Sequence, residues 1–132
     1  MFLNQLSYQE KKMFLDLSIH VAKANDELAA NEKAMISEYC TEMQLPPIEL
    51  YETEPFGTTI DYFALVEEKI KKIVLLELLG LAYVDGTYDE SELKLIKKYT
   101  EAVGIDEDSY AKINTAIQSY YKVCAELAQT IE

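Results

Sequence analysis

Arginine and tryptophan are both absent from this chain of 132 residues, and histidine occurs only once. Arginine is the side chain that binds phosphate and guanine through two parallel hydrogen bonds, and domains that bind nucleic acid carry basic patches. Here 24 acidic residues face 12 lysines, so the net charge is −12. The same charge balance disfavours an anionic membrane surface. We therefore expect no nucleic-acid partner.

Cysteine is also scarce, and no long apolar run is present. Cys40 and Cys124 are far apart and form no CxxC motif, so we expect two half-buried thiols in a reducing compartment. The most apolar stretch, Ile73–Val84, is shorter than the about 20 residues that a membrane span needs. The first twelve residues lack the basic and apolar regions of a signal peptide. These features predict a cytoplasmic protein with no direct membrane insertion.

The stretch Ile73–Val84 is apolar on every helical face except at Glu77 and Gly80. A helix that is apolar all round is typical of a buried central helix. We expect Gly80 to allow close approach of a neighbouring helix. We expect Glu77 to lie at the helix margin or to pair with a lysine such as Lys11 or Lys12.

This central helix is predicted to end at the turn pair Asp85-Gly86. Asp89 and Glu92 then have the spacing of a capping box, in which each side chain binds a backbone N–H of the first helical turn. A helix is therefore predicted from Asp89 to Val103, with Gly104 as its C-cap.

Apolar residues recur at helical spacing in the rest of the chain, and no segment alternates like a half-buried strand. The fold class is predicted to be all-α, a compact helical bundle of about six or seven helices. The other predicted helices run from the Ser7 cap to about Ala24, from Ala30 to Met43, from Ile60 to Val66 before the central helix, and from Glu107 to about Thr130.

The two halves of the chain match when the sequence is shifted by 60 residues. Seven positions between 11 and 45 are identical to their counterparts between 71 and 105, where chance gives about two or three. The repeat predicts two pseudo-twofold helical hairpins packed face to face, closed by the last helix. The identical pairs are Lys11/Lys71, Lys12/Lys72, Leu15/Leu75, Ala22/Ala82, Glu32/Glu92, Ile36/Ile96 and Tyr39/Tyr99.

The segment Ala82–Ile105, AYVDGTYDESELKLIKKYTEAVGI, resembles the signature of the TerB-like family. This family includes tellurite resistance protein B and the N-terminal domain of a membrane-anchored DnaJ-type co-chaperone. The matching pattern is a small residue, Asp-Gly, an acid about seven residues after the Asp, and an apolar helix that ends near Gly-Ile. The first hairpin departs from it, because Asn25-Asp26 stands in place of Asp-Gly and Ala29 in place of Asp89, while Glu32 is kept.

The resemblance implies a single all-helical domain over residues 1–132. It implies a non-enzymatic protein linked to bacterial tellurite and stress-response operons, with an unknown protein partner. It also implies that acidic motif residues hold a divalent cation, and hard oxygen ligands suit Mg²⁺, Ca²⁺ or Mn²⁺. Capping alone also explains Asp89 and Glu92, so both interpretations stay open. The candidate ligands are Asp85, Asp89, Glu92 and Glu32.

Two other functional classes, a calcium sensor and an enzyme, are alternatives that the sequence supports less well. In a calcium-sensor loop with Gly86 at the loop glycine, Leu81 and Tyr83 would fall on positions that need oxygen ligands. An enzyme would need a catalytic constellation, and the sequence shows no nucleophile motif and no phosphate-binding loop. His20 follows Asp16 by four residues, which favours a surface ion pair.

Overall fold

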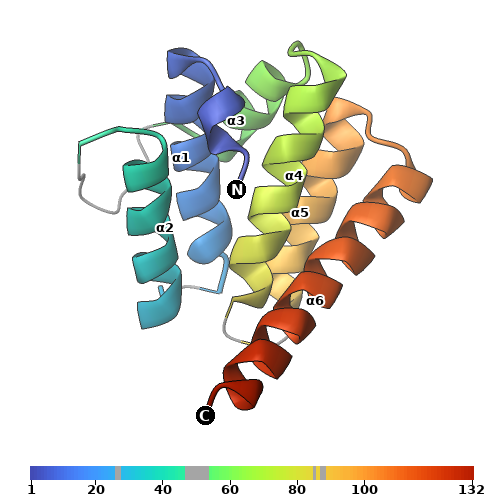
Figure 1. The fold of residues 1–132 in the computed structure, drawn as a ribbon. Helices are drawn as coiled ribbons and strands as arrows, with labels where there is room; N and C mark the ends of the chain where they lie inside the picture. The colour runs from blue at the N-terminus through green and yellow to red at the C-terminus, as the bar shows by residue number, and fades with distance from the viewer. Residues whose placement is uncertain (26–27, 47–53, 85, 87–88) are drawn as a thin grey trace.

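A computed structural model describes residues 1–25, 28–46, 54–84, 86 and 89–132. Over these residues the chain forms helices and no strand, which confirms the all-α prediction (Figure 1). A short 3-10 turn, η1, spans Leu3–Gln5. The six α-helices are α1 (Tyr8–Ala22), α2 (Ala30–Glu42), α3 (Phe56–Phe63), α4 (Glu68–Tyr83), α5 (Glu90–Val103) and α6 (Glu107–Thr130).

Helices α1, α5 and α6 begin at capping residues that the sequence marks. The Ser7 hydroxyl accepts from the Glu10 N–H at 3.2 Å, and the Glu10 carboxylate accepts from the Ser7 N–H at 2.8 Å, so the capping box of α1 is present. The side chain of Asp89 caps α5 by accepting from the Glu92 N–H, and that of Asp106 caps α6 by accepting from the Ser109 N–H. Gly104 ends α5 with a φ of 83°, a left-handed conformation that glycine adopts without strain.

The segment before the central helix differs from the prediction. Helix α3 begins at Phe56 rather than Ile60 and ends at Phe63. Glu67 has extended backbone angles, so the chain breaks there, and α4 starts as a separate helix at Glu68. Leu65, in the connection between the two helices, is 90% exposed.

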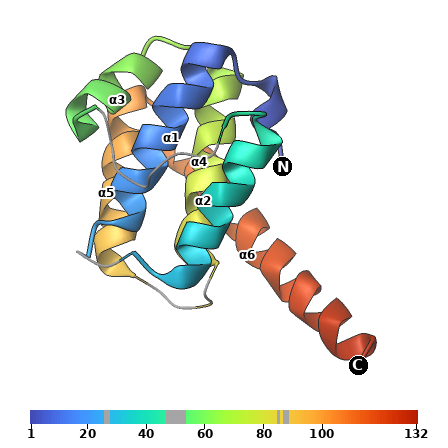
Figure 2. The ribbon, with the colours of Figure 1, turned by 90° about the vertical axis from the view of Figure 1, so that its left-hand side faces the viewer.

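Helix α4 is the centre of the bundle, as predicted, and packs on α1, α2, α5 and α6. Figure 1 shows α1 and α2 on one side of α4 with α5 beside it, and Figure 2 shows α6 leaving the bundle obliquely. Ten residues of α4 are buried, so its apolar character on every face is explained by neighbours on nearly every side.

The repeat corresponds to two hairpins, α1 with α2 and α4 with α5. Most of the identical pairs are buried at both positions, which explains their chemical similarity, because a buried position tolerates few side-chain shapes. The pairs buried in both halves are Leu15/Leu75, Ala22/Ala82, Glu32/Glu92, Ile36/Ile96 and Tyr39/Tyr99.

Helix α6 packs on α4 through the part that ends at Tyr121. Its one buried residue is Ile117, and Ile113 and Tyr121 are partly buried against the core. The C-terminal end of the helix extends past the rest of the protein (Figures 1 and 2), and residues 122–132 are all exposed.

Candidate functional site

Asp89 lies where the loops of the two hairpins meet. Its Oδ1 accepts from the Glu92 N–H at 3.0 Å, which confirms its predicted role as the cap of α5. Its Oδ2 accepts from the side-chain amide of Asn25 at 2.5 Å. Asn25 lies in the turn after α1 and is the repeat counterpart of Asp85, so this contact joins that turn to the start of α5.

Of the other predicted cation ligands, the structure describes Glu32 and Glu92 but not Asp85. Glu32 and Glu92 occupy the first turns of α2 and α5, and each is 3% exposed. Asp85 lies outside the residues that the structure describes. Among the residues it does describe, no three His, Cys, Asp or Glu side chains gather as a metal ion would require. Cation binding at this loop therefore stays a prediction.

The calcium-sensor interpretation is weakened by helix α4. Leu81 and Tyr83, which would fall in the first part of such a loop, belong to α4, and Leu81 is fully buried. A helical segment with a buried leucine cannot offer the oxygen ligands of a calcium loop.

His20 contacts residues outside α1. Its Nε2 lies 2.6 Å from the backbone carbonyl oxygen of Glu54, and its ring packs edge-on against Phe56. Asp16 is 7% exposed, so the prediction that it lies on the surface was wrong. These contacts join α1 to the start of α3 and to Glu54 just before it.

A second concave site, unmarked by any motif, lies between α2, α4 and α6. It has a volume of about 440 Å³, within the range of small ligand sites. We call it the acidic groove. It is lined by the carboxylates Glu38, Glu42 and Glu77, the tyrosines Tyr39, Tyr120 and Tyr121, the apolar side chains Met35, Leu76 and Ile117, and Met1, with Gly80 at its base.

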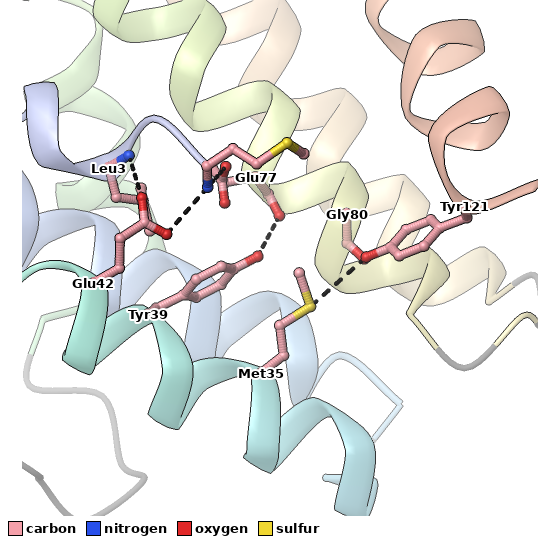
Figure 3. Close-up of polar contacts among 8 residues, drawn as sticks. Leu3, Met35, Tyr39, Glu42, Glu77, Gly80 and Tyr121 are labelled. Carbon is pink, nitrogen blue, oxygen red and sulfur yellow. Dashed lines mark hydrogen bonds and ion pairs between the residues drawn. The ribbon is translucent and has the colours of Figure 1, made fainter. Parts of the chain in front are cut away.

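Glu77 is the buried carboxylate of this groove, with 4% of its surface exposed. Its Oε1 accepts from the amino group of Met1 at 2.8 Å, and the same amino group lies 3.1 Å from Glu42 (Figure 3). Glu42 also accepts from the Leu3 N–H at 2.8 Å. The prediction of a marginal position or a lysine partner was therefore wrong. The ion pair satisfies a charge that would otherwise be costly to bury.

The repeat shows how unusual Glu77 is. Its counterpart in the first hairpin is Leu17, which is completely buried. The fold can therefore accommodate an apolar side chain at this position, and the carboxylate is a feature of the second hairpin only. The backbone oxygen of Glu77 also accepts from the Tyr39 hydroxyl at 2.7 Å, and this hydrogen bond links α2 to α4.

The negative charge of the groove shifts the proton affinity of its neighbours. Burial lowers the pKa of the Met1 amino group, but the hydrogen bonds and attraction of Glu77 and Glu42 outweigh burial and raise it above 8.0. Burial, followed by the charge of Glu77, raises the pKa of Tyr121 to about 12. The same two causes hold the pKa of Tyr39 well above 10.0. Both tyrosines therefore keep their protons at neutral pH and act as hydrogen-bond donors.

Gly80 lies where α2 and α6 approach α4, as predicted from its place in the central helix. The Tyr121 hydroxyl donates to the Gly80 carbonyl oxygen at 2.7 Å and lies 3.9 Å from the Met35 sulfur (Figure 3). A Cβ built on Gly80 would lie 3.5 Å from Met35 and Tyr121 and 3.7 Å from Ile117, all ordinary contact distances. The close approach therefore leaves room for a methyl group but not for a large side chain.

No protein-family model matches this chain, and neither the curated proteins nor the solved structures give a match. Within the described residues, every helix is too short or too polar to cross a membrane. The acidic groove could not have been found from motifs, because its residues come from three helices. The only sequence signal for it was a glutamate inside an apolar helix.

Proposed function

We propose that this protein is a non-enzymatic interaction module of the TerB-like type, acting in the bacterial stress response. Its acidic groove would dock a basic, amphipathic segment of a partner protein. The observation that carries this proposal is the set of three carboxylates beside apolar side chains in one concave site.

The groove has the two properties that such a segment needs. Met35, Leu76 and Ile117 form apolar walls, and methionine adapts its shape to different partners. Glu38 and Glu42, one turn apart on α2, offer carboxylates at the rim. Opposite charges across an interface provide specificity and speed association.

The contact of Met1 shows how the carboxylates of the groove bind an ammonium group. A primary ammonium lies between Glu42 and Glu77 at hydrogen-bond distance from both. Among the described residues that line the groove, it is the one cationic group against three carboxylates. A lysine ammonium of a partner would find the same kind of charged acceptor at Glu38 and Glu42.

The test compares two model helices in a fluorescence titration. One peptide presents leucines on one face and lysines on the other, and the second has glutamates in place of the lysines. We expect the basic peptide alone to bind, with the affinity falling at high salt. Glu38→Lys should weaken binding, whereas Glu101→Lys, the same charge change at an exposed site on α5, should preserve it.

Two results would contradict the proposal. Equal binding of both peptides would show that the carboxylates do not select the partner. Equal weakening by Glu38→Lys and Glu101→Lys would mean that the overall charge of −12 attracts the peptide without a specific site.

Divalent-cation binding at the hairpin loop is a second proposed property, favoured by the contact of Asn25 with Asp89. This contact brings the loop of the first hairpin to a predicted ligand of the second. The buried repeat partners Glu32 and Glu92 flank the same two loops. The proposed ligands are Asp85, Asp89, Glu92 and Glu32.

A further inference from the structure

The second half of α6, together with its C-cap residue Ile131, carries an exposed apolar face. Tyr120 is 47% exposed, Val123 50%, Leu127 59% and Ile131 85%, and Cys124 is also exposed. Figure 2 shows this half of the helix extending beyond the bundle. A helix with one apolar face normally buries that face against another element.

The spacing of this face is that of a coiled coil. Apolar residues follow one another at alternating steps of four and three, the heptad pattern in which two helices pack along a narrow seam. The seam consists of Ile113, Ile117, Tyr120, Cys124, Leu127 and Ile131. Ile117 is 2% exposed and Ile113 is partly buried. The first two positions thus pack on the body of the protein, by which we mean the bundle of α1 to α5. The seam continues beyond this body without a partner in the described chain.

The charge of this segment differs from that of the whole protein. Between residues 118 and 131 the charged side chains are Lys122 and Glu126, so the segment is neutral within a chain of net charge −12. Neither of them occupies a seam position. Two such segments can therefore meet without placing like charges opposite each other.

We propose that the seam is covered by a second copy of this chain, in an antiparallel pair of α6 helices related by a twofold axis. Such an interface is self-complementary. In antiparallel packing Tyr120 lies opposite Ile131 of the second copy, and Cys124 lies opposite its Leu127. This inference goes beyond the proposed function, because it uses neither the groove carboxylates nor a foreign partner.

The body of the protein determines the antiparallel orientation. Ile113 and Ile117 hold the body against the same face that carries the exposed seam. In a parallel pair the two bodies would have to occupy the same space beside the seam. In an antiparallel pair they lie at opposite ends, offset by about 16 Å between residues 120 and 131. That offset is about twice the Debye length of roughly 8 Å, so the acidic bodies repel each other weakly.

Sedimentation equilibrium across the micromolar to millimolar range tests the dimer. We expect the wild type to dimerise reversibly and Leu127→Glu to raise the dissociation constant about tenfold or more, because a charge replaces a seam leucine. Leu65→Glu, at a 90% exposed leucine between α3 and α4, should leave the constant unchanged. Circular dichroism should show the same helicity in all three proteins. A monomeric wild type, or equal effects of the two substitutions, would overturn the proposal.

Cross-linking tests the orientation. The double variant Cys124→Ser/Leu127→Cys is mixed with wild type, and thiols are oxidised with excess oxidised glutathione. In the antiparallel pair the thiol at position 127 meets Cys124 of the other chain, so mixed dimers should dominate. Homodimers of each protein, joined at equal positions, would show a parallel pair and overturn the proposed arrangement.

Discussion

The hydroxyl of Tyr121 donates a hydrogen bond to the backbone oxygen of Gly80 at 2.7 Å. The two residues lie 41 positions apart, and their contact joins α6 to the central helix at the base of the acidic groove. This hydrogen bond lies at the point beyond which α6 leaves the bundle. Since Tyr121 is the last partly buried residue of α6, this bond holds the position from which the exposed half extends.

Tyr121→Phe should lower the free energy of unfolding at pH 7 by about 0.5–1.5 kcal/mol, the usual value of one hydrogen bond. The pKa of Tyr121 is raised to about 12 in the folded protein, from an ordinary value of 10.0. Its contribution is therefore complete below pH 10 and is lost as the pH rises from 10 through 12. Urea unfolding of both proteins between pH 7 and 11 should show their difference shrinking above pH 10. A constant difference would contradict the assigned pKa.

Gly80→Ala should raise the stability by about 0.5–1 kcal/mol, because alanine loses less backbone entropy in a helix and its methyl group fits. Gly80→Leu should lower it by about 1–3 kcal/mol through overpacking against Met35, Tyr121 and Ile117. Denaturation midpoints check both values. Gly57, an exposed glycine with open space around it in α3, provides the matched pair of control substitutions.

Glu77→Gln should destabilise the protein at pH 7 by about 1–3 kcal/mol, because the ammonium of Met1 loses its buried charged partner. Glu67→Gln, at an exposed glutamate just before α4, serves as the control and should have little effect. Thermal unfolding of the two variants gives the comparison. Equal stability of Glu77→Gln and the wild type would mean that the ion pair contributes nothing.

Asn25→Asp should destabilise the protein at neutral pH, because a carboxylate would replace the amide that donates to Asp89. The loss should diminish as the pH falls and one of the two carboxylates takes up a proton. Melting curves from pH 4 to 8 measure this recovery. Asn114→Asp, at a partly buried asparagine of α6 that accepts rather than donates toward Tyr83, is the control and should show no such recovery.

A specific cation site would raise the stability by about 2.7 kcal/mol at a cation concentration of 100 times its dissociation constant. Melting with Ca²⁺, Mg²⁺ or Mn²⁺ should then show a gain for the wild type that disappears in Asp85→Asn. The same gain in both proteins would indicate screening of the −12 charge and no site at Asp85.

The local features of the fold could be predicted from the sequence. Ser7, Asp89, Gly104 and Asp106 mark helix ends, because capping depends on residues three or four positions apart. The helical periodicity predicted the fold class, and the apolar run around Leu78 predicted the central helix. The repeat predicted two hairpins, since five of its seven identities fall at positions that are buried in both halves.

The candidate sites depended on contacts that sequence spacing does not contain. The partner of Glu77 is the amino group of Met1, 76 residues away, and no local pattern connects them. The apolar stripe of α6 reads as one continuous face in the sequence, yet only tertiary packing decides that Ile117 is buried and Leu127 exposed. Periodicity shows which face of a helix is apolar, whereas the length of the helix that it packs against determines how much of that face is covered.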